Sequence, residues 1–279
     1  MKLLYLIANH EINPSVATFV GKVAAKMGAS LTILAAAEDE TQLEKIRSQV
    51  QALGSLPGTA PERTYFVKDN PVAAMEAELA RQDYTMMLFN VPRRRRLIPS
   101  NYRILSQRII KRANVPVMLV RNVSKNFERM LVCTGGLEIS EPVVHLSTKL
   151  AGSTGLLATL LTVSVAVPSM YTGMEELDES LEKLLGTDTP VAQHLRHSAE
   201  ELTTHGIPAE IKIRHGDVVE AILEETKEGH YDLVVLGETE GSTLRGLLLG
   251  NVTQQIVNRA PCAVLISKSE AEPAFEGSA

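Results

Sequence analysis

Apolar residues occur along the chain in two alternating patterns: short continuous runs, and longer segments with helical spacing. Residues 233–236 form a short apolar run of the kind that becomes a buried strand. Residues 191–205 carry apolar side chains at Leu195, Ala199 and Leu202, a spacing typical of an amphipathic helix. This alternation predicts parallel sheets that are covered by helices on both faces. The expected strands are 3–8, 30–36, 64–67, 86–89, 117–120, 130–134, 156–165, 209–214, 233–236 and 263–267, and the expected helices are 14–27, 38–53, 72–81, 103–112, 142–151, 191–205, 218–228 and 252–258.

The pattern occurs twice, at a nearly constant spacing. Tyr84 and Tyr231 stand in matching segments and differ by 147 in residue number, since 231 minus 84 is 147. Gly28 and Gly155, which precede the second strand of each half, differ by 127. The difference between these offsets predicts an insertion of about 20 residues in the second half, near residues 168–190.

The repeat predicts two domains in tandem, residues 1–122 and 128–268, each with a five-stranded, mostly parallel sheet. Residues 121–127 form the expected linker, and residues 269–279 form a tail for which we expect no fixed structure.

The loop after residues 233–236 carries the residues that bear on function. Gly237 ends the expected strand, and Gly250 stands just before the expected helix 252–258. Glycine lets the backbone approach a bulky anion, and a helix N-terminus offers free N–H groups to that anion. The loop resembles that of the universal stress protein family, whose pattern is Gly, two residues, Gly, nine residues, Gly, then Ser or Thr. The strand order and the last apolar run, 260–266, resemble this family as well.

The resemblance covers nearly the whole chain, twice, and implies two Rossmann-like domains of the adenine nucleotide alpha hydrolase-like type. Family members with the full pattern bind ATP, so the resemblance implies a site for ATP or another adenine nucleotide in the second domain, with no metal other than a nucleotide-bound Mg²⁺. The residues that it assigns to this site are Thr134, Gly135, Val163, Leu236, Gly237, Gly250, Asn251 and Val252.

Three positions depart from the family pattern. Glu240 replaces the middle glycine, and its carboxylate would repel phosphate groups. Asn251 replaces Ser or Thr but can still donate a hydrogen bond to an oxyanion. Gly135 stands where nucleotide binders carry Asp. The alternative is that these glycines only permit turns.

The first half has lost the pattern entirely. Asn90, Arg93 and Arg103 occupy the three glycine positions, and the loop instead carries four consecutive arginines, 93–96. Arg93, Arg94, Arg95 and Arg96 could attract an acidic or anionic partner, the alternative being a solvated basic loop. Nucleic acid is disfavoured because aromatic residues are not interleaved with the arginines and the chain has a net charge of -5.

Charge is divided unevenly between the halves. Residues 1–122 contain 17 Lys and Arg and 10 Asp and Glu, a net charge of +7, so the remainder carries -12. The two halves can therefore attract each other or meet different partners. No apolar run reaches the roughly 18 residues that a membrane span needs, which predicts a protein that is not inserted in a membrane. Cys133 and Cys262 lack metal-ligand spacing and are expected to be buried and reduced, in a cytoplasmic protein.

Catalytic and metal-binding motifs are not found in the sequence. His194 and His197, at i and i+3, could hold a metal, but exposed helix histidines are the simpler interpretation because a cluster of further ligands is lacking. The lack of these motifs favours a non-enzymatic protein, and the family resemblance implies a stress-response or regulatory role with a possible nucleotide site in the second domain. The alternative is a slow ATPase or another ATP-using enzyme on the related fold.

The last strands of the two halves are expected to pair with each other. In the family that the chain resembles, these strands pair between subunits, so a tandem chain can satisfy the pairing internally, as a pseudo-dimer. Residues 117–120 would then run antiparallel to 264–267. A homodimer of whole chains is left open.

Overall fold

A computed structural model gives the fold of the chain. It describes residues 1–9, 12–53, 60–91, 100–121, 123, 127–135, 140–164, 181–237 and 244–268, with the backbone alone at 53, 100, 101 and 244–251. The chain forms two compact units. Unit 1 contains Met1–Lys125 together with Cys262–Ala279, and unit 2 contains Asn126–Pro261.

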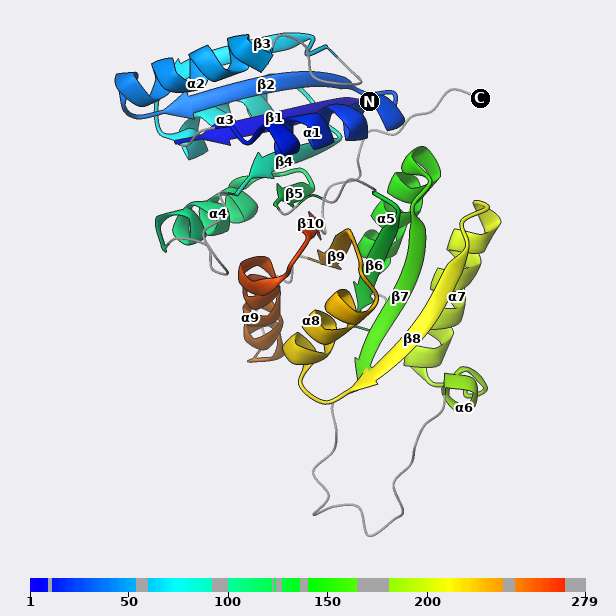
Figure 1. Cartoon of the computed structure of the whole chain (residues 1–279). Helices are drawn as coiled ribbons and strands as arrows, with labels where there is room; N and C mark the ends of the chain where they lie inside the picture. Colours follow the sequence, from blue (N-terminus) through cyan, green and yellow to red (C-terminus); the bar gives the residue numbers. More distant parts are fainter. Residues whose placement is uncertain are drawn as a thin grey trace. The chain divides into compact units, whose positions relative to one another are not determined.

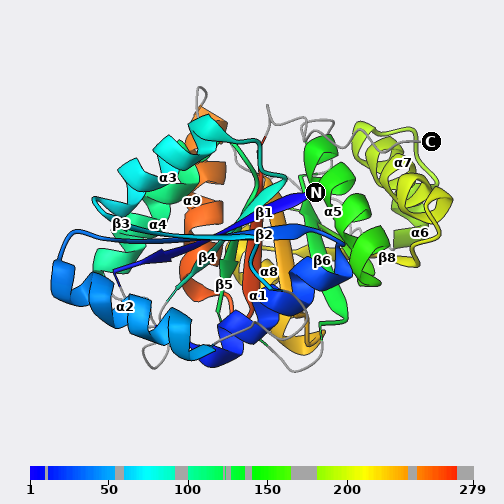
Figure 2. The same ribbon diagram turned by 90° about the horizontal axis from the view of Figure 1, so that it is seen from above.

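Unit 1 is an α/β sandwich built on a sheet in the order β3-β2-β1-β4-β5-β10 (Figure 1). Its first five strands run parallel, while β10 runs antiparallel to β5. Helices α1 and α2 lie on one side of this sheet and α3 and α4 on the other (Figure 2). The elements of unit 1 are β1 (Lys2–Ala8), α1 (Pro14–Lys26), β2 (Ser30–Ala37), α2 (Glu40–Leu53), β3 (Arg63–Lys68), α3 (Pro71–Arg81), β4 (Met86–Asn90), α4 (Ser100–Arg112), β5 (Val117–Val120) and β10 (Ala263–Ser267).

Unit 2 has the same plan, with a parallel sheet in the order β9-β6-β7-β8. Helix α5 packs against α7, and α8 packs against α9. The elements of unit 2 are β6 (Arg129–Thr134), α5 (Glu141–Thr154), β7 (Leu157–Ser164), α6 (Leu181–Leu185), α7 (Pro190–Thr204), β8 (Ala209–His215), α8 (Val218–Glu228), β9 (Leu233–Gly237) and α9 (Leu244–Arg259).

Local sequence signals explain where several helices begin. Asn13 and Asn70 each accept a hydrogen bond from a first-turn N–H group through the side chain, and each is followed by proline at the first helical position. Asp217 caps α8 in the same way. Such residues satisfy N–H groups that have no partner inside the helix.

The repeat seen in the sequence is also a structural repeat. The β1–β2 register pairs Lys2 with Ser30, and the β6–β7 register pairs Arg129 with Leu157, which are the same pairs shifted by 127. Gly28 and Gly155 both adopt positive φ angles, 57° and 74°, between a helix and the next strand. A left-handed conformation is strained for residues that carry a Cβ atom, so this turn favours glycine in both halves.

The predicted antiparallel pairing of the last two strands is confirmed. Val264 pairs with Leu119 and Ile266 with Val117, and every residue of β5 and β10 is buried. An uncovered β5 would present an apolar strand edge that invites aggregation. Strand β10 therefore completes the sheet of unit 1, although it belongs to the second sequence repeat.

Two buried cations follow these strands. Arg121, directly after β5, donates from Nε to the carbonyl oxygen of Cys262 at 3.3 Å. Burial lowers the pKa of Arg121 to about 10, which still leaves it charged at neutral pH. Lys268, directly after β10, donates from Nζ to the carbonyl oxygen of Ile110. Both contacts lie within unit 1 and fix the ends of the strand pair.

The structure differs from the sequence expectations at three places. Helix α9 begins at Leu244 and not near Val252, and a short helix, α6, lies within the insertion. The compact units also end differently from the repeats, because Cys262–Ala279 groups with unit 1. The domain limits 1–122 and 128–268 therefore remain a prediction about the repeat.

Candidate functional site

The carboxyl ends of three parallel strands meet at one edge of unit 2. Thr134, the last residue of β6, pairs with Thr162 of β7. Val132 pairs with Val235, which places Thr134, two residues later, level with Gly237 at the end of β9. In open α/β sheets, ligands bind beyond this edge. The structure thus brings together four of the predicted site residues: Thr134, Val163, Leu236 and Gly237.

Thr134 supplies a buried polar group at this edge. Its side chain is only 6% exposed, and its Oγ1 atom has no hydrogen-bond partner in the part of the chain that the structure describes. Leaving a buried hydroxyl without a partner costs about 1–3 kcal/mol, so such a group calls for an explanation. A ligand oxygen or nitrogen at this edge could satisfy it.

The next residue, Gly135, is hydrogen-bonded to the start of α5. The N–H group of Gly135 donates to Oγ of Ser140 at 2.9 Å. Ser140 is buried and stands at the start of α5. The predicted site residue Gly135 therefore lies at the edge, but its N–H group is already engaged by Ser140.

Gly237 has a packing role that the sequence did not predict. A Cβ atom there would lie 3.2 Å from Cγ2 of Val143 on α5, so glycine allows this helix to approach the strand end. The Gly237 carbonyl oxygen accepts a hydrogen bond from Oγ1 of Thr253 on α9 at 3.2 Å. Thr253, two residues beyond Asn251, is a contact that the loop pattern alone did not reveal.

The prediction that Gly250 precedes a helix N-terminus is wrong. Because α9 begins at Leu244, Gly250, Asn251 and Val252 lie inside the helix, where their N–H groups belong to its hydrogen-bond ladder. Only the first four N–H groups of a helix remain free, those of residues 244–247. The reason is that residues 244–259 contain no proline and four leucines, so helical propensity outweighs the cost of about 1 kcal/mol for an interior glycine. Glu240 and Gly241 lie outside the described residues.

The equivalent edge of unit 1 is built differently. Asn90, at the position of Gly237, is a buried polar residue that ends β4. Asn9, after β1, has a positive φ of 52°, and its carbonyl oxygen accepts from the Tyr102 hydroxyl at 2.7 Å. Arg103 is exposed on α4. Arg93, Arg94, Arg95 and Arg96 lie outside the described residues. Tyr102 of α4 thus reaches the carboxyl edge of the unit 1 sheet, which is equivalent to the candidate ligand edge of unit 2.

Comparison with known proteins assigns the family. Residues 126–268, more than half of the chain, match the model of the Universal stress protein family. The chain belongs to the universal stress protein family. It is 25% identical to universal stress protein YxiE of Bacillus subtilis (strain 168) over 148 residues, which is 50% of this chain and 98% of that relative.

Solved structures of whole-chain length share the fold of this universal stress protein. A universal stress protein from Archaeoglobus fulgidus DSM 4304 gives a TM-score of 0.63 at 16% identity, covering 95% of this chain and 98% of the other. A putative universal stress protein from Pseudomonas aeruginosa UCBPP-PA14 gives 0.63 at 12% identity, covering 96% and 92%. The similarity covers both halves and confirms two tandem Rossmann-like α/β domains as the fold class.

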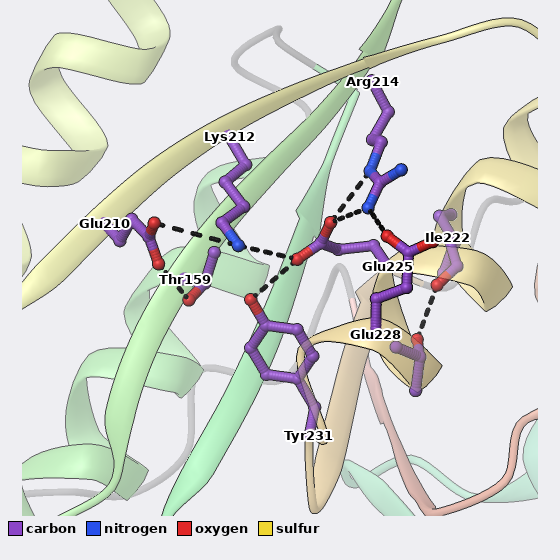
Figure 3. Close-up of polar contacts among 9 residues, drawn as sticks. Thr159, Glu210, Lys212, Arg214, Ile222, Glu225, Glu228 and Tyr231 are labelled. Atoms are coloured by element: carbon purple, nitrogen blue, oxygen red, sulfur yellow. Dashed lines mark hydrogen bonds and ion pairs between the residues drawn. The ribbon is translucent and has the colours of Figure 1, made fainter.

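A polar cluster in unit 2 surrounds a buried carboxylate on α8 (Figure 3). Glu225 is 2% exposed and accepts hydrogen bonds from Lys212 Nζ at 3.0 Å, Arg214 Nε at 2.8 Å and the Tyr231 hydroxyl at 3.1 Å. Burial raises the pKa of the Glu225 carboxyl, but the bonds from Arg214, Lys212 and Tyr231 outweigh burial and hold this pKa below its ordinary value. A carboxylate so fully paired is suited to holding α8 against β8 and is poorly suited to general-base catalysis.

Unit 1 repeats part of this cluster. Glu78 and Tyr84 stand 147 residues before Glu225 and Tyr231, and the Tyr84 hydroxyl donates to Oε1 of Glu78 at 2.6 Å. Tyr65 and Val67 occupy the positions of Lys212 and Arg214. The buried glutamate–tyrosine bond is therefore common to both units, and the two cations are specific to unit 2.

The remaining candidates from the sequence are His194 and the two cysteines. His194 is buried on α7, which makes the expectation of an exposed histidine wrong for this residue, and its Nε2 atom lies 3.4 Å from Oγ of Ser198. Cys133 is half-buried, Cys262 is buried, and both are free thiols. Within the described residues, His, Cys, Asp and Glu form no group of three that could hold a metal, and no helix is long and apolar enough to cross a membrane.

Proposed function

We propose that this universal stress protein is a non-enzymatic, cytoplasmic regulatory protein of the stress response, whose second unit binds ATP or another adenine nucleotide. The observation that carries the proposal is the buried hydroxyl of Thr134, which has no hydrogen-bond partner among the described residues and lies at the edge where β6, β7 and β9 end. A hydroxyl can donate to a phosphate or sugar oxygen and accept from an amino group. Gly237, half-buried beside it, adds backbone without side-chain bulk.

Unit 1 is proposed to have a structural role. Its edge carries Asn90 in place of glycine, and Tyr102 already bonds the backbone of Asn9. These contacts fix the edge and occupy polar groups that a nucleotide would need. The chain would then hold one nucleotide, in unit 2.

The enzymatic alternative, a slow ATPase or another ATP-using enzyme, requires a group at the edge that can activate a nucleophile. No such base is present among the four site residues Thr134, Val163, Leu236 and Gly237. The carboxylate of Glu225 is already bound by Lys212, Arg214 and Tyr231. The two functions differ in one measurable property. A regulatory nucleotide site returns bound ATP unchanged over many hours, whereas an ATPase releases phosphate.

Calorimetric titration with ATP and AMP tests the proposal. The wild type should bind nucleotide, and Thr134→Val should weaken binding by up to about tenfold, the effect of one hydrogen bond. Valine is close in shape to threonine, so folding should be unaffected. Glu240→Gly should strengthen ATP binding by about 1–2 kcal/mol, because the family pattern assigns position 240 to the phosphate-binding loop, where a negative charge would repel the phosphates.

Thr226→Val is a matched control, since the hydroxyl of Thr226 bonds the carbonyl oxygen of Ile222 within α8 at 2.6 Å. It should leave nucleotide affinity unchanged. If neither the wild type nor Glu240→Gly binds any adenine nucleotide, the proposed site is wrong. If Thr134→Val and Thr226→Val weaken binding equally, the role given to Thr134 is wrong.

A further inference from the structure

A long segment of unit 1 carries only positive charge. From Tyr84 to Phe127 the sequence contains no Asp or Glu. Its ten basic residues are Arg93, Arg94, Arg95, Arg96, Arg103, Arg108, Lys111, Arg112, Arg121 and Lys125. The chain as a whole is acidic, so this segment is a local concentration of cations and not a reflection of composition.

Four of these cations lie exposed on helix α4. Ser106, Ile109 and Ile110 form its buried side. The opposite side exposes Arg103, Ile104, Arg108, Lys111 and Arg112. At about 100° per residue, Ile104, Arg108 and Lys111 fall within one arc of roughly 60°. The outer face of α4 is thus a cationic surface that includes one exposed apolar residue.

Among the described residues, one of these four charges forms an ion pair. Arg112 lies 3.5 Å from Glu76 across the gap to α3. Arg103, Arg108 and Lys111 form no ion pair with any residue that the structure describes. Neighbouring like charges repel one another, and a nearby anion reduces this repulsion. This face should therefore attract a negatively charged partner.

The second copy shows that the fold does not require these cations. Adding 147 places Gln255 at the position of Arg108, Asn258 at that of Lys111 and Asn251 at that of Ile104. Helix α9 forms with these uncharged residues. The charges of Arg108 and Lys111 are therefore a property of unit 1 that needs an explanation other than helix formation.

We propose that the exposed face of α4 is a docking surface for an anionic membrane. Ile104 is 51% exposed, and Arg108 and Lys111 stand beside it. Basic side chains around an outward-facing apolar one suit the boundary between acidic headgroups and acyl chains. A nucleic acid would be better served by exposed aromatic rings, and Tyr102, the aromatic residue of α4, has its hydroxyl bound to Asn9.

Co-sedimentation of the full-length protein with lipid vesicles tests this surface. The vesicles contain 70% phosphatidylcholine and 30% phosphatidylserine, and vesicles of phosphatidylcholine alone serve for comparison. The protein should bind only the anionic vesicles, with affinity that falls as salt increases. The variant Arg108→Gln/Lys111→Asn, which copies the residues of α9, should bind about 25-fold more weakly, since each cation near the surface contributes about fivefold.

Two further variants distinguish a specific surface from general charge. Lys22→Gln/Lys45→Asn removes two exposed lysines from α1 and α2 and changes net charge equally, and it should reduce binding by less than about threefold because screening weakens distant charges. Ile104→Asn should weaken vesicle binding severalfold through lost apolar contact. Equal losses from the two double variants would overturn the proposal. So would wild-type binding to single-stranded DNA with no binding to anionic vesicles, an outcome that assigns the face to nucleic acid.

Discussion

A buried glutamate–tyrosine hydrogen bond occurs in both units, and in unit 2 two cations also bind the glutamate. This difference allows a matched prediction. Tyr84→Phe and Tyr231→Phe each remove one hydroxyl without opening a cavity. In unit 1, the Tyr84 hydroxyl makes the one hydrogen bond that the described residues give to the Glu78 side chain, at 2.6 Å. In unit 2, Glu225 keeps Lys212 and Arg214 when Tyr231 is changed. Tyr84→Phe should therefore be the more destabilising of the two.

The expected magnitudes follow from what remains after each change. Loss of the 3.1 Å Tyr231 bond leaves a carboxylate that is still neutralised, so the free energy of unfolding should fall by about 1 kcal/mol. Loss of the Tyr84 bond leaves Glu78, 5% exposed, without a donor, and should cost about 2–3 kcal/mol. The expected difference between the variants is roughly 1–2 kcal/mol, which urea titration resolves.

Hydrogen exchange read by mass spectrometry locates each effect. Peptides from β1–β4 should lose protection in Tyr84→Phe, and peptides from β6–β9 in Tyr231→Phe, because stability differs between regions of one chain. The double variant Glu78→Leu/Tyr84→Phe should recover part of the loss, because replacing both partners leaves no unsatisfied polar group. Equal losses in the two single variants, or no recovery in the double variant, would refute the reasoning.

Two other changes test packing in unit 1. Tyr5→Phe should leave the midpoint of thermal unfolding unchanged or raise it by a few degrees, since the Tyr5 hydroxyl is fully buried with no hydrogen-bond partner among the described residues; a fall in the midpoint would show that this hydroxyl is bonded. Truncation after Pro261 removes β10 and exposes the edge of β5, so the shortened chain should aggregate in light scattering, whereas truncation after Lys268 should leave it soluble.

Most of the fold could be predicted because the apolar pattern repeats at fixed offsets. The 127-residue and 147-residue offsets correspond to equal strand registers and to the paired glutamate–tyrosine bonds. The pairing of β5 with β10 was predicted from the apolar character of both strands together with the family resemblance. What the sequence could not reveal is that contacts group Cys262–Ala279 with unit 1, since repeat boundaries record sequence similarity and not packing.

The candidate site was harder to predict. Its residues at strand ends, Thr134, Val163, Leu236 and Gly237, follow from topology, and they do lie at one edge. The start of α9 was predicted too late because Gly250 was interpreted as a helix boundary, whereas leucine-rich flanks let the helix continue through it. The contact between Thr253 and Gly237 depends on how α9 packs, which residue spacing alone does not specify.

The two copies are internal controls for each other, because both must satisfy the same folding physics. Features that occur in both, such as the positive φ of Gly28 and Gly155 and the buried glutamate–tyrosine bond, are explained by the fold. Features that differ require another explanation. Lys212 and Arg214 of unit 2 support the buried carboxylate of Glu225, whereas no such support of a buried charge, among the described residues, accounts for the differences at the carboxyl edges of the sheets and on α4 and α9. Gly237 occupies the position in the second copy that Asn90 occupies in the first, and Gln255 likewise corresponds to Arg108. Since α4 and α9 both form despite this difference in charge, the differences are better assigned to ligands and partners than to stability. This is why the nucleotide proposal is confined to unit 2 and the membrane proposal to unit 1.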